Sequence, residues 1–139
     1  MTHYATAQRG WKPAASLLVV GATPEDRDTI SDALRNDAYD IMFCDSLDTT
    51  DLRRFDLRPY DACVMELNQP VETCFDLLTA IRSSCPLTEV IIFSRLADED
   101  LWIELIQRGV YDFLPKPLDR KELQRIVKNA VEKNRTRHQ

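Results

Sequence analysis

Three side chains that could act together chemically stand at the ends of three short apolar runs. Glu66, Ser94 and Lys116 each come at or just past the carboxyl end of such a run. The carboxyl ends of parallel strands meet at one edge of an α/β sheet, where such proteins place their functional groups. A carboxylate, a hydroxyl and an ammonium would therefore share one crevice. The acid is a glutamate, so its carboxylate reaches further from the strand than that of an aspartate.

Alternating apolar runs and helical stretches predict the framework that holds these side chains. Residues 17–20 form a continuous apolar run, which is typical of a strand covered on both faces. Further strands are predicted at residues 39–44, 62–66, 89–93 and 111–114. Helical stretches follow them, including a short one at 48–55 and a longer one at about 97–108. This order predicts one α/β domain with a doubly wound, flavodoxin-like parallel sheet of strand order 2-1-3-4-5.

Composition and charge narrow the functional classes. The chain has 139 residues and a formal net charge of −5, and this length suits a single domain. The acidic balance argues against direct nucleic-acid binding, which normally needs a basic face. No apolar run approaches the ~20 residues of a membrane span, and residues 1–15 lack the apolar core of a signal peptide. We therefore expect a cytoplasmic protein that does not enter a membrane.

The cysteines and histidines do not form a metal-binding pattern. The sequence has no CxxC pair, and its two histidines lie near the chain ends. We expect no metal site and no disulfide, with reduced cysteines that pack in the interior. The four cysteines are Cys44, Cys63, Cys74 and Cys85.

The predicted domain covers residues 15–134 and leaves a segment at each end. Residues 1–14 are expected to form a flexible arm, in which Trp11 either docks on the domain or belongs to an interface. Residues 135–139 are all polar, so this polar tail is either a solvated helix end or the start of a linker.

Four segments resemble the receiver domain of two-component response regulators. They read LLVV at 17–20, YDACVMELNQP at 60–70, VIIFS at 90–94 and GVYDFLPKPL at 109–118. The last segment is the most specific, and the resemblance extends over about residues 16–134. It implies a signalling module rather than an enzyme. It also implies protein partners, namely a histidine kinase, an output domain or another regulator.

The resemblance assigns positions to the crevice residues. Receivers of this family take a phosphoryl group onto an aspartate with the help of Mg²⁺. Glu66 stands at the phosphoacceptor position, Ser94 at the hydroxyl position and Lys116 at the lysine position. Phe113 corresponds to the switch aromatic, and the bond before Pro117 is expected to be cis.

Departures from the family pattern predict a degenerate site. Gly21 and Ala22 replace the acidic pair and offer no side-chain ligand, whereas Mg²⁺ needs hard oxygen ligands. The longer Glu66 misplaces its carboxylate for in-line transfer. Arg95 replaces a small residue, so its guanidinium would fill the space of a phosphoryl group or pair with Glu66. We expect no catalytic residue and no cofactor.

Glu66 and Phe113 each have two interpretations. Glu66 either mimics a phosphorylated aspartate through a pair with Lys116, or only neutralises that lysine. Phe113 is either a moving switch residue or a core residue of the fifth strand.

The helix at 97–108 carries more apolar residues than one core-facing stripe needs. Leu105 and Ile106 are expected to face the core, and Trp102 or Ile103 to reach the surface. In the receiver family that the chain resembles, the usual dimer or partner face is formed by the fourth helix, the fifth strand and the fifth helix. An exposed aromatic residue there would suit an interface.

The sequence thus predicts a pseudo-receiver that acts through protein contacts without Mg²⁺-dependent phosphorylation. One alternative is a conventional receiver that accepts phosphate at Glu66 or Ser94. Another is a flavodoxin-like enzyme or cofactor protein. That class is disfavoured because residues 21–24 contain a single glycine and a proline, a poor phosphate-binding loop.

Overall fold

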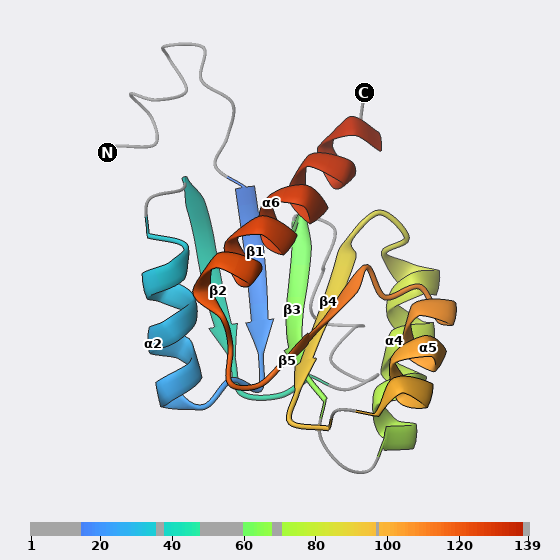
Figure 1. Cartoon of the computed structure of the whole chain (residues 1–139). Coiled ribbons are helices and arrows are strands. Elements are labelled where there is room, and N and C mark those ends of the chain that lie inside the picture. Colours follow the sequence, from blue (N-terminus) through green and yellow to red (C-terminus); the bar gives the residue numbers. More distant parts are fainter. Residues whose placement is uncertain (1–14, 36–37, 48–59, 68–70, 97, 138–139) are drawn as a thin grey trace.

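The computed structural model describes residues 15–35, 38–47, 60–67, 71–96 and 98–137 (Figure 1). The strands are β1 (Ala15–Val20), β2 (Tyr39–Cys44), β3 (Ala62–Glu66), β4 (Glu89–Ser94) and β5 (Asp112–Pro115). The described helices are α2 (Pro24–Ala33), α4 (Val71–Ser84), α5 (Glu99–Gln107) and α6 (Arg120–Arg137). The short helix expected at 48–55 lies outside the described residues, as do Trp11 and the rest of the N-terminal arm.

The five strands form one sheet with the order β2-β1-β3-β4-β5, which confirms the predicted topology. All four strand pairs are parallel, so their carboxyl ends lie at the same edge, at the bottom of Figure 1. The strand order reverses between β1 and β3. In doubly wound sheets a crevice opens at the carboxyl ends at such a point.

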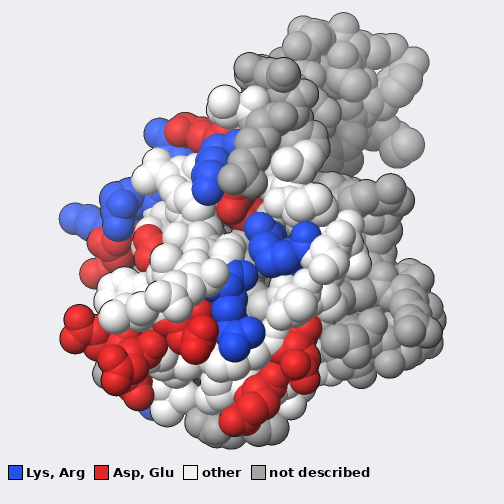
Figure 2. All heavy atoms as spheres, turned by 90° about the vertical axis from the view of Figure 1, so that its right-hand side faces the viewer, with Lys and Arg blue, Asp and Glu red and all other residues white. Residues whose placement is uncertain are grey.

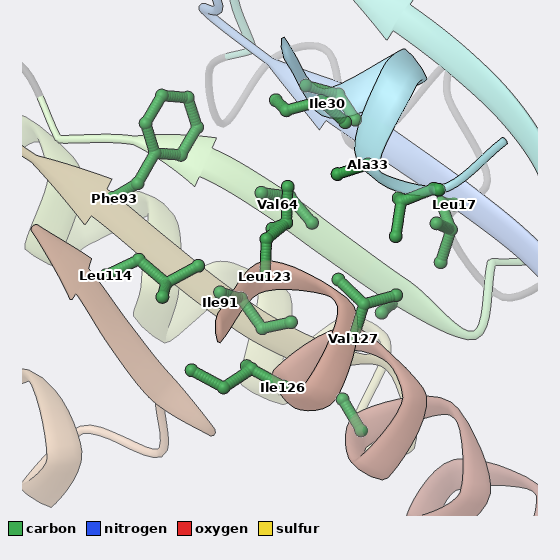
Figure 3. Packing of buried hydrophobic residues seen from close by; sticks show 14 of the residues in the cluster. Leu17, Ile30, Ala33, Val64, Ile91, Phe93, Leu114, Leu123, Ile126 and Val127 are labelled. Atoms are coloured by element: carbon green, nitrogen blue, oxygen red, sulfur yellow. The ribbon is translucent and has the colours of Figure 1, made fainter. Parts of the chain in front are cut away.

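Alternate side chains of the sheet enter two hydrophobic cores. On one face, α2 and α6 cover the sheet, and Leu123 and Val127 of α6 pack near Val64 of β3 (Figure 3). On the other face, α4 and α5 cover residues such as Cys63 and Ile92. Both faces of the sheet are therefore buried. This explains why β1, β3 and β4 consist mainly of apolar residues and do not alternate between apolar and polar ones.

Local sequence signals shape the loops at both edges of the sheet. Thr23 caps α2, because its Oγ1 accepts a hydrogen bond from the Asp26 amide at 3.1 Å, and a proline follows at the first helical position. Gly109 ends the turn after α5 with φ of 95°, a conformation that glycine adopts without strain. The peptide bond between Lys116 and Pro117 is cis, as the resemblance implies.

Helix α6 continues through Arg137 and is anchored at the amino edge of the sheet. Arg135 Nε lies 3.5 Å from Asp61 Oδ1, and the Asn134 amide donates to the Leu87 carbonyl. The first residues of the expected polar tail are therefore helical. Within the described ranges, no helix is both long and apolar enough to span a bilayer.

Candidate functional site

Glu66 and Lys116 meet at the carboxyl edge of the sheet, which confirms that they share a crevice. Lys116 Nζ donates a hydrogen bond to Glu66 Oε2 at 3.2 Å. A second carboxylate, from the first turn of α2, lies closer, with Asp26 Oδ2 2.7 Å from the same nitrogen. The Asp26 contact has the distance of an ion pair but not the direction of a hydrogen bond. The ammonium of Lys116 is thus held between two acids from different elements.

This ion cluster is nearly shielded from solvent. The Lys116 side chain is only 6% exposed, and those of Asp26 and Glu66 are 13% exposed each. Burial alone lowers the pKa of Lys116, but the contacts with Asp26 and Glu66 outweigh it and raise the pKa above its usual value. Lys116 is therefore a permanently charged group at neutral pH, and the two carboxylates neutralise it.

Ser94 lies beside the cluster, with its hydroxyl turned to the backbone. The residue is 2% exposed, and its Oγ accepts a hydrogen bond from the Leu96 amide at 3.0 Å. Its carbonyl accepts from the Lys116 amide at 2.9 Å, which holds the β5 end against β4. Phe93 packs below, with its ring centroid 5.9 Å from Lys116 Nζ. The hydroxyl thus organises the loop after β4 in this structure.

The residues after β1 do not fit a divalent cation. Gly21 has no side chain and adopts φ of 80°, a value that other residues rarely take, and Ala22 is buried with only a methyl group. Among the described residues, no group of three or more acids, cysteines or histidines could hold a metal ion. Both carboxylates beside Lys116 already pair with its ammonium, so the described residues offer Mg²⁺ a poor set of ligands.

The absence of side chains after β1 leaves a small void beside Glu66. Its volume is about 130 Å³, enough for a few water molecules but not for a cofactor. The void is lined by Val20, Gly21, Asp45, Ser46, Leu47, Met65, Glu66, Thr73, Cys74 and Leu77.

Arg95 is not an ion-pair partner of Glu66 in the described part of the chain. The residue is exposed, and the ion-pair partner that the described chain provides for Glu66 is Lys116. The expected Arg95–Glu66 pair is therefore not formed. That Arg95 blocks the entry of a phosphoryl group stays a prediction.

The outer face of α5 is more apolar than the sequence indicated. Trp102 and Ile103 are both exposed, at 44% and 49%. The expectation for Ile106 was wrong, because this residue is also exposed, whereas Leu105 is buried as expected. Successive residues of an α-helix point in different directions around its axis. Because Leu105 faces the core, the next residue, Ile106, faces solvent.

These exposed residues border an open groove of about 580 Å³ between α5 and β5. The side of the molecule that carries α4 and α5 shows uncharged surface next to acidic side chains at its lower edge (Figure 2). The groove is lined by Asp98, Glu99, Trp102, Ile103, Ile106, Gln107, Phe113 and Pro115. It is a candidate protein-binding surface rather than part of the ion cluster.

Asp26 is the site residue that sequence reasoning missed. An acid in the first turn of a helix is ordinarily explained by its favourable interaction with the helix N-terminus, so the position of Asp26 in the sequence suggests no further role. A signal was nevertheless present, because Asp26, Ile30 and Ala33 are spaced for one helix face, and both apolar members are buried. A charged residue on a core-facing stripe requires an internal partner.

The fold and the lysine crevice define a phosphoreceiver-type signalling domain, and comparison with known families agrees. The model of the response regulator receiver domain matches residues 17–128. The chain belongs to the response regulator receiver domain family.

Individual relatives support the same assignment. The chain is 32% identical over 119 residues to the DNA-binding transcriptional regulator NtrC of Bradyrhizobium sp. (strain RP501 Parasponia), covering 86% of this chain and 25% of that protein. It is 30% identical over 117 residues to NtrC of Rhizobium meliloti, covering 84% of this chain and 24% of that protein. The chain thus spans about a quarter of the length of these curated relatives.

Solved structures share the fold. A response regulator from Thermotoga maritima superposes with a TM-score of 0.74 at 24% identity, covering 86% of this chain and 98% of that chain. NtrX from Brucella abortus superposes with a TM-score of 0.73 at 22% identity, covering 90% of this chain and 28% of that chain.

Proposed function

We propose that this receiver domain signals through protein contacts and does not undergo Mg²⁺-dependent phosphorylation. The observation that carries the proposal is the state of Lys116, which is already held between two carboxylates. Among the residues that the structure describes, no group of three or more acids, cysteines or histidines could hold a metal ion. An incoming phosphoryl group would have to compete with both carboxylates for this lysine. Here Glu66 occupies it, either as a mimic of the phosphorylated state or as a plain neutralising partner.

Electrostatics argue in the same direction. A phosphoryl group brings a charge of about −1.5 to −2 at neutral pH. The pocket already holds two carboxylates against one ammonium, so the incoming group would meet an excess of negative charge. Without a divalent cation to neutralise that charge, transfer loses its main electrostatic support.

The test is covalent labelling. The protein is incubated with acetyl phosphate and MgCl₂, next to a receiver that carries the acidic pair and the aspartate, and both are measured by intact mass. We expect the phosphoryl adduct only on the second protein. A stoichiometric, acid-labile adduct on this chain would favour the alternative of a conventional receiver that uses Glu66 or Ser94.

Protein partners are the second part of the proposal. Receivers related to NtrC act with kinases and with output domains, and this chain would contact such a partner or a second copy of itself across α5, β5 and α6. The support is the exposed cluster of Trp102, Ile103 and Ile106 beside the groove. Large apolar side chains of this kind form the energetic centre of interfaces. The domain would have no catalytic activity, no direct role in nucleic-acid binding and a cytoplasmic location.

Self-association is tested by sedimentation velocity over a range of concentrations. A homodimer across this face should dissociate in Ile103→Glu, because a charge would enter the apolar contact. Met42→Glu is the matched control, since Met42 is equally exposed, at 52%, but lies on β2 at the other edge of the sheet. If the wild-type protein were monomeric at every concentration, the homodimer would be excluded, and the remaining candidate for this face would be a different protein.

A further inference from the structure

The first turn of α2 is built to hold Asp26 in the lysine pocket. Thr23 caps the helix through the Asp26 amide, which fixes the backbone of Asp26 while its side chain points inward. The next residue, Arg27, secures the same turn from outside. Its Nε donates to the Ala22 carbonyl at 3.2 Å, and its Nη2 pairs with Asp45 at 2.8 Å. The position of Asp26 is thus determined by contacts that do not involve Lys116.

Asp26 lies where its charge has a large effect. Its Oδ2 is nearer to Lys116 Nζ than the Glu66 oxygen is, at 2.7 Å against 3.2 Å. At an exposure of 13% the carboxylate is largely removed from water, and such a charge is costly without a partner. Asp26 and Lys116 therefore stabilise each other, and the pair connects α2 to the end of β5.

The pocket needs a second acid for a geometric reason. Gly21 and Ala22 provide no charge at the end of β1, so without Asp26 the ion pair with Glu66 would be the remaining carboxylate contact of Lys116 among the described residues. The carboxylate of Asp26, which comes from α2, supplies a second negative charge to the same ammonium. With both acids in place, an added anion would have to displace one of them to reach the ammonium.

We propose that Asp26 is a built-in counter-ion that closes the pocket from helix α2, so that Lys116 binds neither a free anion nor a phosphoryl group. The inference rests on the proposed function, because it explains how a receiver pocket is kept in one charge state without phosphorylation or metal. It assigns to Asp26 a positioning role: the residue holds the lysine, and through it the loop between β5 and α6.

The direct test follows the side chain of Lys116 by NMR as the pH is raised. In Asp26→Asn and in Glu66→Gln, the lysine should lose its proton at a lower pH than in the wild type, because each variant removes one negative neighbour. Glu25→Gln is the matched control, since this acid lies in the same turn but is exposed. It should leave the titration unchanged. If Asp26→Asn also left it unchanged, Asp26 would not be the counter-ion.

A wild-type measurement keeps the test independent of how well Asp26→Asn folds. The ¹³C signal of the Asp26 carboxylate should shift in step with the deprotonation of Lys116, because the two groups are in contact. A signal that does not respond would overturn the proposal.

Anion binding tests the closure itself, with inorganic phosphate as the probe. The wild type should show no phosphate-dependent shift at the Lys116 side chain. Asp26→Asn/Glu66→Gln should bind phosphate there at least about tenfold more tightly, the change expected from freeing a charge-assisted contact. Equal binding by both proteins would show that the acids do not close the pocket. Labelling by acetyl phosphate, in contrast, would refute the proposed function whatever the titrations show.

Discussion

The ring of Trp102 lies against the ring of Phe113, with centroids 5.7 Å apart and planes inclined by 32°. Phe113 is 5% exposed and Trp102 is 44% exposed. In this structure the aromatic residue at the switch position is therefore a core residue of β5, covered by a surface tryptophan of α5. This supports the simpler of the two interpretations of Phe113 for the conformation described.

The two rings should contribute unequally to stability. Phe113→Ala empties a buried site, so we expect the free energy of unfolding to fall by about 3–5 kcal/mol. Trp102→Ala removes a half-exposed ring and one aromatic contact, so the loss should be about 1 kcal/mol. Urea unfolding followed by circular dichroism measures both. Equal losses would mean that Phe113 is not the better-packed residue.

Thiol chemistry should distinguish Cys44 from the other cysteines. Burial raises the pKa of Cys63 to about 12 and that of Cys74 to about 11, so both stay protonated and unreactive at neutral pH. Cys85 is also buried, and Cys44 is the one cysteine that is only partly buried.

Modification with Ellman's reagent should therefore show a single fast thiol in the native protein and four in denaturant. The fast phase should disappear in Cys44→Ala. A fast phase that survives this substitution would show that one of the interior cysteines becomes accessible without global unfolding.

Stability should decrease at alkaline pH, in part through Lys116. The folded pKa of this lysine is raised by its two acidic partners after burial has opposed them. The contribution of Lys116 to the free energy of unfolding is therefore complete below the ordinary lysine pKa of about 10.4. It is lost as the pH rises through the pKa that Lys116 has in the folded protein. Tyr60 and Tyr111 act in the same direction, because burial raises the pKa of each.

The variant Lys116→Met distinguishes the contribution of the lysine to the pH dependence of stability from that of the two tyrosines. Removing the lysine leaves two buried carboxylates without their cation, so the variant should be less stable by about 3–5 kcal/mol. The difference from the wild type, measured by urea unfolding between about pH 9 and about pH 12, should shrink above about pH 10.4. A constant difference over this range would contradict the assigned charge state of Lys116.

Shortening the acid should not restore phosphorylation. Glu66→Asp supplies the residue that receivers phosphorylate, but Gly21 and Ala22 still provide no metal ligand and Asp26 still pairs with Lys116. We expect no phosphoryl adduct with acetyl phosphate and MgCl₂, by the same intact-mass measurement and with Glu66→Gln as the control. Strong labelling of the single variant would show that the missing acidic pair is not the limiting defect.

The fold and part of the crevice could be predicted from the amino-acid sequence. Apolar runs such as residues 90–93 report burial on both faces, and the order of strands and helices restricts the topology, so the parallel sheet followed from local patterns. Glu66, Ser94 and Lys116 were found because the residue at the end of a parallel strand lies at a known edge.

Which charged side chains contact one another could not be predicted from the sequence and became visible in the three-dimensional structure. Asp26 belongs to a helix start, where an acid is ordinarily explained by the helix dipole, and its contact with Lys116 depends on how α2 packs on the sheet. Ile106 likewise lies on a helix with apolar residues on most sides, and the rotation of α5 about its axis decides which of them face solvent. Long-range side-chain contacts of this kind depend on the relative placement of whole elements, which local sequence patterns do not encode.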